Sequence, residues 1–159
     1  MKIYFASDHG GFELKQKLIP YVASLGFEVE DFGNTVMDPE DDYPDFVIPL
    51  SKKISSEPES KGIILGGSGQ GEAIVANRFR GVRAMVFNGQ YEPKEGRPIP
   101  PEIHTSREHN DSNVLSLGAR FLNEAEAKQA VKEWLETPFP GEERHVRRIK
   151  KIDYITDNT

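Results

Sequence analysis

The residues with the clearest capacity for chemistry form a glycine-rich stretch, GGSGQGE, at positions 66–72. An apolar run at 62–65 precedes it, and a segment that can form a helix follows. Glycines let backbone N–H groups point into one concavity, and a helix N-terminus adds partial positive charge. The pattern therefore predicts a strand, an anion-binding loop and a helix, with Gly67, Gly69 and Gly71 lining the loop.

Glu72 is expected in the first helical turn, next to this loop. A carboxylate there can take a proton from a bound substrate, and the loop N–H groups can stabilise the enolate that forms. The same pattern also describes an ordinary turn followed by a favourable first-turn acid. On this stretch alone, both interpretations stay open.

The histidines supply further candidates, at positions 9, 104, 109 and 145. His9 follows Asp8 and can bind an anion or transfer a proton, but Asp8 can equally cap the next helix. His109 lies in the polar run 106–111, which also fits a solvated helix end. Zinc held by Asp8, His9 and His109 is disfavoured, because no close ligand spacing such as His-x-x-x-His occurs.

Two charged segments have plain alternatives. Arg144 and Arg148 are four residues apart, so they share a helix face and can clamp a phosphate, or simply form an exposed basic surface. The acidic run at 38–42 is expected to be a solvated loop rather than a metal site, because cation-binding loops space their oxygens around glycine turns.

The composition limits the function. The chain has 159 residues, a net charge of −6 and no cysteine. The acidic balance argues against nucleic acid as a partner, and the lack of cysteine excludes disulfides and a thiol nucleophile. Apolar stretches are too short to span a membrane. Residues 1–6 begin a strand pattern rather than a leader, so we expect a cytoplasmic protein.

The positioning elements follow from hydrophobic periodicity, in which five strand-like runs alternate with helical patterns. The expected strands are 2–7, 27–32, 61–65, 81–87 and 113–117, and the expected helices are 12–25, 43–55, one from about 72, 105–109 capped by Thr105 or Ser106, 123–136 and 142–153. Pro20 is expected to kink or end the first helix. The alternation predicts an α/β fold, a single-domain, doubly wound (Rossmann-like), mostly parallel sheet with helices on both faces over 1–159.

Ligands of such sheets bind beyond the carboxyl ends of the strands. The segments after the first, third and fourth strands are therefore expected to share one site: Asp8–His9, the glycine loop and the loop leading to His109. That last loop, residues 88–105, contains four prolines and is expected to be an irregular, functional insertion. Residues 142–159 are expected to form a C-terminal helix and tail, of which the part past Lys151 has no clear place in this scheme.

Several segments together form a more specific pattern. They are SDHGGFELK at 7–15, DYPD at 42–45, GGSGQG at 66–71, ANR at 76–78, SREHND at 106–111, LGAR at 117–120 and RHVRR at 144–148. In this order they resemble the ribose-5-phosphate isomerase B family, which includes the galactose-6-phosphate isomerase subunits.

The resemblance implies an aldose–ketose isomerase that needs neither metal nor cofactor. Its substrate would be ribose 5-phosphate or a hexose 6-phosphate of the allose or galactose type. In the family a base removes the C2 proton of the opened sugar, a cis-enediolate forms in the glycine loop, and the proton returns at C1. Many members use a cysteine at the position of Gly66. Another branch has glycine there and a glutamate at the position of Glu72, which makes Glu72 the implied base.

The resemblance also implies the remaining roles. Ser68 would move a proton between O1 and O2, His109 would help open the ring, and Asp8 would hold a hydroxyl or the ring oxygen. The implied substrate- and phosphate-binding residues are His9, Tyr43, Asn110, Arg120, Arg144 and Arg148. A homodimer with the site between subunits, or a dimer of dimers, is expected. A non-catalytic phosphosugar-binding module is the alternative, and it would need neither Glu72 nor His109.

Overall fold

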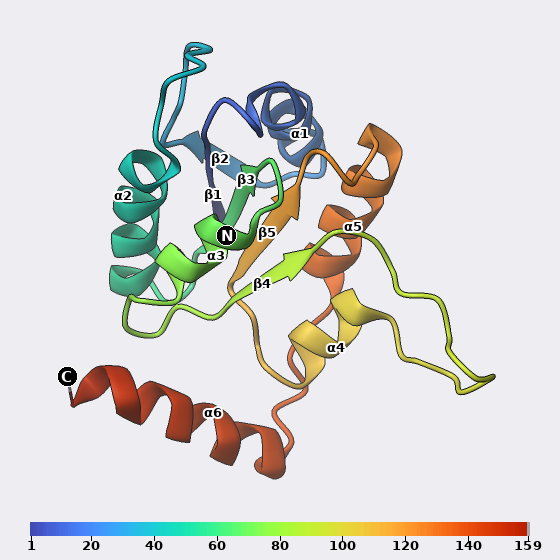
Figure 1. The fold of residues 1–159 in the computed structure, drawn as a ribbon. Coiled ribbons are helices and arrows are strands. Elements are labelled where there is room, and N and C mark those ends of the chain that lie inside the picture. The colour runs from blue at the N-terminus through green and yellow to red at the C-terminus, as the bar shows by residue number, and fades with distance from the viewer. Residues whose placement is uncertain (159) are drawn as a thin grey trace.

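A parallel sheet of five strands forms the centre of the protein (Figure 1). The structure is a computed structural model that describes residues 1–158. The strands are β1 (Lys2–Ser7), β2 (Glu28–Asp31), β3 (Lys61–Gly66), β4 (Ala84–Phe87) and β5 (Val114–Gly118), in the order β2-β1-β3-β5-β4. All four strand pairs are parallel, so the predicted α/β fold is confirmed and the sheet is wholly rather than mostly parallel.

The register aligns the ends of the three central strands. Leu65 pairs with Ser7 of β1 on one side and with Leu117 of β5 on the other. The segments that follow these strands therefore leave the same edge of the sheet side by side. The strand order reverses between β1 and β3, and this is the place where parallel α/β sheets bind ligands.

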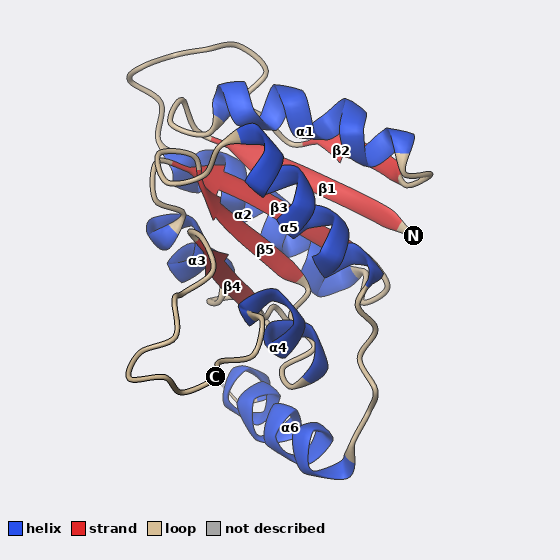
Figure 2. Ribbon diagram, turned by 90° about the vertical axis from the view of Figure 1, so that its right-hand side faces the viewer, coloured by secondary structure: helices blue, strands red, loops and turns tan. Residues whose placement is uncertain are grey.

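Both faces of the sheet are covered, which explains the continuous apolar runs of the central strands. Side chains alternate along β1: Phe5 belongs to the core on one face, and Tyr4 belongs to the core on the other. The helices α1 (Phe12–Ser24) and α5 (Glu124–Glu136) cover the first face, and α2 (Tyr43–Ser56) and α3 (Gln70–Ala76) cover the second (Figure 2). The predicted capping box of α5 is present, with Asn123 and Glu126 bonded reciprocally.

Two local expectations differ from the structure. The first helix does not end at Pro20 but continues to Ser24; Pro20 is exposed, while Leu18 and Val22 are buried against the sheet. The helix α4 (Glu102–Glu108) begins before Thr105, which therefore does not cap it. Irregular structure after β4 accordingly ends at residue 101.

After β4 the chain crosses from the carboxyl edge of the sheet back to the opposite edge. The loop 88–101 extends from the body, and α4 then returns to the opposite edge of the sheet, where β5 begins (Figure 1). Arg83, which leads into β4, donates from Nε to the backbone oxygens of Asn110 and Asp111 at that edge. The last helix, α6 (Glu143–Asp157), lies near this edge and away from the glycine loop (Figure 2). No helix within residues 1–158 has the length and apolar character needed to cross a membrane.

Candidate active site

The glycine loop is tied to the end of β5. The backbone N–H groups of Ala119 and Arg120 donate to the oxygens of Gly66 and Gly67 at 2.9 and 3.1 Å. Asn88 donates from Nδ2 to the backbone oxygen of Ser68 at 3.0 Å. These three bonds fix the position of the loop relative to the residues that follow β5 and β4.

Close contacts explain why the loop consists of glycines. Gly69 has a positive φ of 74°, which other residues adopt only with strain. A β-carbon at Gly71 would lie 2.7 Å from Oη of Tyr43, and one at Gly67 would lie 3.0 Å from Cζ of Arg120. The structure thus places Tyr43 and Arg120, both singled out from the sequence, directly against the loop.

Glu72 lies in the first turn of α3, as predicted, and only 4% of its surface is exposed. A β-carbon at Gly66 would overlap Cδ and Oε1 of Glu72 and would lie 2.8 Å from Oε2. The carboxyl group therefore occupies the space above Gly66 into which a longer residue at that position would project. Burial raises the pKa of Glu72 above its ordinary value of 4.5, and the nearby Asp8 adds to this effect.

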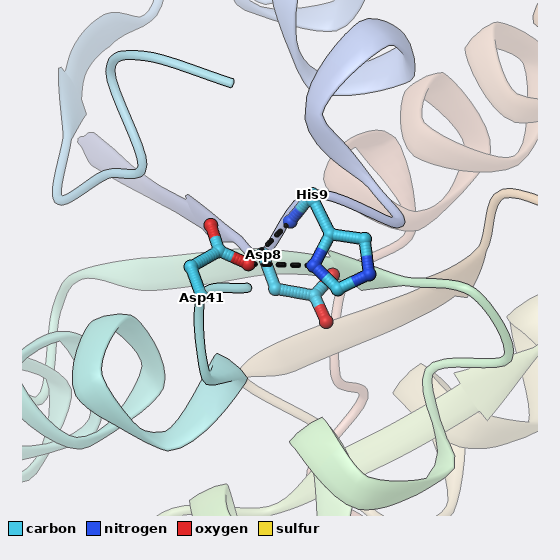
Figure 3. A group of neighbouring side chains, drawn as sticks. All are labelled: Asp8, His9 and Asp41. Carbon is cyan, nitrogen blue, oxygen red and sulfur yellow. Dashed lines mark hydrogen bonds and ion pairs between the residues drawn. The ribbon is translucent and has the colours of Figure 1, made fainter. Parts of the chain in front are cut away.

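Asp8 and His9 leave β1 beside the loop. Asp8 is 9% exposed, and its Oδ1 accepts a hydrogen bond from the N–H of Gly10 at 2.9 Å. The imidazole of His9 lies over it and contacts Asp41, with Nδ1 at 2.7 Å from Oδ1 (Figure 3). The hydrogen bond to Asp41 raises the pKa of His9 above its ordinary value of 6.5.

Asp41 is the residue of this site that the sequence did not reveal. It belongs to the acidic run 38–42, which we expected to be solvated, yet its side chain is only 7% exposed. The expectation is wrong for Asp41 because both carboxylate oxygens are bonded inside the protein. No spacing pattern could have indicated it, since 32 residues separate Asp41 from His9.

Within residues 1–158, one group of side chains could together hold a metal ion: Asp8, His9 and Asp41, with ligand atoms within 4.8 Å of one another. Two of these atoms, Nδ1 of His9 and Oδ1 of Asp41, already face each other at hydrogen-bond distance. The arrangement is therefore explained by a hydrogen-bonded pair beside a carboxylate.

The second set of candidates lies at the opposite edge of the sheet. The ring of His109, at the end of α4, stacks on His145 of α6 with centroids 4.3 Å apart and planes 12° apart. Arg144 and Arg148 flank His145 on α6 and are exposed, as is Asn110. Burial, with the charges of His109 and the two arginines, lowers the pKa of His145.

The expectation that His109 shares an edge with Asp8 and the glycine loop in one chain is therefore wrong. The loop after β4 does leave the carboxyl edge, but α4 carries the chain back before His109 is reached. The candidate residues of one chain thus form two separate groups. We name them the base half-site (Asp8, His9, Tyr43, Ser68, Glu72 and Arg120) and the His109 half-site (His109, Asn110, Arg144 and Arg148).

A doubly wound parallel sheet with a glycine-rich loop and a buried carboxyl group at its switch point is the arrangement in which α/β proteins bind small ligands. The comparisons with known proteins are more specific. A family model described as Ribose/Galactose Isomerase matches residues 3–152. Ribose-5-phosphate isomerase B of Escherichia coli is 34% identical over 154 residues, which cover 97% of this chain and 95% of that protein.

Solved structures of ribose-5-phosphate isomerase B also match this chain over nearly its whole length. Ribose-5-phosphate isomerase B of Clostridium thermocellum matches with a TM-score of 0.87 and 37% identity, over 99% of this chain and 98% of that one. The Mycoplasma genitalium enzyme with bound ribulose-5-phosphate matches with a TM-score of 0.89 and 32% identity, over 99% and 97%. The chain belongs to the ribose/galactose isomerase family and is an enzyme of the aldose–ketose isomerase type.

Proposed function

We propose that the protein interconverts ribose 5-phosphate and ribulose 5-phosphate through a cis-enediolate, without a metal ion, and that Glu72 is the base. The observation that carries this proposal is the buried Glu72 carboxyl group beside the glycine loop. The relative from Mycoplasma genitalium binds ribulose-5-phosphate, which supports a five-carbon substrate.

The environment of Glu72 suits proton abstraction. A general base works best when its pKa lies near the operating pH, and burial raises the pKa of Glu72 in that direction. In the proposed reaction Glu72 takes the proton from C2 of the open-chain sugar and returns it to C1. Backbone N–H groups of the loop stabilise the negative oxygen of the enediolate, while Ser68 moves a proton between O1 and O2.

We infer that the complete site needs two copies of the chain. The base half-site and the His109 half-site lie at opposite edges of one sheet, so they cannot contact one substrate molecule. In a two-fold symmetric dimer, each base half-site can meet the His109 half-site of the other copy, giving two equivalent sites. His109 and Asn110 would then contact the sugar opposite Asp8 and Tyr43. His9 and Arg120 of one copy, with Arg144 and Arg148 of the other, would bind the phosphate.

The chemical test is turnover of aldose phosphates by the purified protein, with and without a chelator. Ribose 5-phosphate, allose 6-phosphate and galactose 6-phosphate form the panel, so that a six-carbon substrate would be detected as well. Glu72→Gln keeps the shape of the side chain and removes the base, and we expect it to lower kcat by about 10²–10⁴-fold. Glu13→Gln, an exposed first-turn acid of α1, is the matched control. Unchanged turnover in Glu72→Gln would reject the assignment of the base.

Complementation tests the shared site. Glu72→Gln and His109→Asn each disable every site of their own homodimer. Unfolding and refolding a 1:1 mixture should create mixed dimers in which one of two sites is intact, so about a quarter of wild-type activity should return. If the mixture stays as inactive as its components while forming mixed dimers, the half-sites are not combined in this way.

A further inference from the structure

Asp41 makes an unusual set of contacts for a residue in an acidic loop. Its Oδ1 accepts a hydrogen bond from the backbone N–H of His9 at 2.9 Å and lies 2.7 Å from Nδ1 of the same residue. Its Oδ2 accepts from Nδ2 of Asn34 at 2.5 Å. Both carboxylate oxygens therefore accept hydrogen bonds, Oδ1 from His9 and Oδ2 from Asn34.

A buried network fixes this carboxylate in place. Asn34 is 4% exposed, and its backbone N–H donates to the oxygen of Ser7 at 2.8 Å. Its backbone oxygen accepts from Nζ of Lys15 at 2.6 Å, and Lys15 is fully buried and bonded to Asp31 at 2.7 Å. Asp41 is thus anchored through α1 and β2, so its position does not depend on a ligand.

This geometry determines the state of the His9 ring. A carboxylate can only accept hydrogen bonds, so Nδ1 of His9 must carry a proton and donate it in the hydrogen bond that Asp41 accepts. Nε2 then lies on the far side of the ring, pointing away from Asp41 (Figure 3). The charged groups around the ring are Asp41, Asp8 and Arg120.

We propose that Asp41 is a positioning residue, which holds the His9 ring with Nδ1–H on Asp41 and thereby directs Nε2 to the phosphorylated substrate. The role in binding rests on the function proposed above, whereas the orientation of the ring does not. Asp41 touches no substrate in this scheme and acts only through His9.

The orientation is tested by nitrogen NMR of the full chain, labelled with ¹⁵N-histidine and recorded above the pKa of the ring. A His9→Gln variant assigns the signals among the four histidines. In the wild type, His9 should show a protonated Nδ1 and an unprotonated Nε2. In Asp41→Ala the proton should shift towards Nε2, because Nδ1 has lost its acceptor. The control is Asp42→Asn at an exposed neighbouring position. It removes one negative charge, as Asp41→Ala does, and should leave the His9 signals unchanged.

Kinetics with ribose 5-phosphate test the role in binding. Asp41→Ala should raise KM on the order of tenfold and leave kcat within about twofold, as expected for a lost charge-assisted contact that acts on binding. Asp41→Asn keeps an acceptor oxygen and should recover part of the loss, which also covers the case in which Asp41→Ala fails to fold. A wild-type tautomer in both variants would overturn the proposal, as would an altered tautomer with unchanged KM. Absence of turnover in the wild type would instead reject the proposed function, and the NMR result would still decide the orientation.

Discussion

The space shared by Gly66 and Glu72 leads to a sharp prediction. A β-carbon at position 66 would overlap Cδ and Oε1 of Glu72, so Gly66→Ala must displace the carboxyl group. The overlapped atoms are the end of a flexible side chain, which can rotate away. We therefore expect a loss of only about 1–3 kcal/mol in the free energy of unfolding, the range for a modest overpacking. Turnover should fall far more, by about 10²–10⁴-fold, because the base is moved.

A double-mutant cycle separates displacement from general damage. In a Glu72→Ala background the space is empty, so Gly66→Ala should cost almost no stability and no further activity. Urea denaturation measures the stability, and isomerisation of ribose 5-phosphate measures kcat. Gly66→Ala retaining kcat within threefold of the wild type would refute the placement of Glu72 as the base.

The same space offers a test by gain of function. Gly66→Cys in the Glu72→Ala background places a thiol where the carboxyl group was, and we expect it to recover measurable turnover. Iodoacetamide should abolish that turnover and leave the wild type unaffected, because the natural chain has no cysteine. Recovered turnover that resists alkylation would argue against the thiol as the base.

Three further predictions concern buried ionisable groups. Burial raises the pKa of Glu72 in the folded protein, so its ionisation lowers stability as pH rises through 4.5, and the full penalty is present above the folded-state pKa. By calorimetry, Glu72→Gln should therefore unfold at a higher temperature than the wild type at pH 8 and at the same temperature near pH 4. The difference in the free energy of unfolding should be about 1.4 kcal/mol for each unit of pKa shift. Lys15 is fully buried and paired with Asp31, so Asp31→Asn should lower the free energy of unfolding by about 3–5 kcal/mol, measured by urea denaturation. A loss smaller than the one from breaking an exposed pair, such as Lys53–Glu57, would contradict this prediction. His145 has a lowered pKa, and its buried Nε2 has no hydrogen bond, so His145→Phe should raise the free energy of unfolding by about 1 kcal/mol. The gain should grow as pH falls below 6.5, because the folded protein binds a proton at His145 less readily than the unfolded chain does. A pH-independent difference would exclude titration of His145 as the source of the gain.

The sequence by itself determined the architecture and placed Glu72 beside the glycine loop. Alternating strand and helix patterns require a parallel sheet with helices on both faces, and each main element is found within a few residues of its expected position. The glycine stretch and Glu72 are contiguous, so their proximity follows from local geometry. Pro20 shows the limit of such local rules, because the packing of Leu18 and Val22 on the sheet outweighs one lost hydrogen bond.

Only the tertiary structure decided which distant residues meet. Asp41 reaches His9 because a buried network folds its loop against β1, and nothing in the spacing of 32 residues encodes that contact. His109 is separated from Glu72 because α4 returns to the other edge of the sheet before the chain reaches it. Local sequence patterns report the conformation of neighbouring residues, whereas the partners of a side chain depend on how elements pack across the whole chain, and that packing joins His9 to Asp41 and divides the candidate site into two halves.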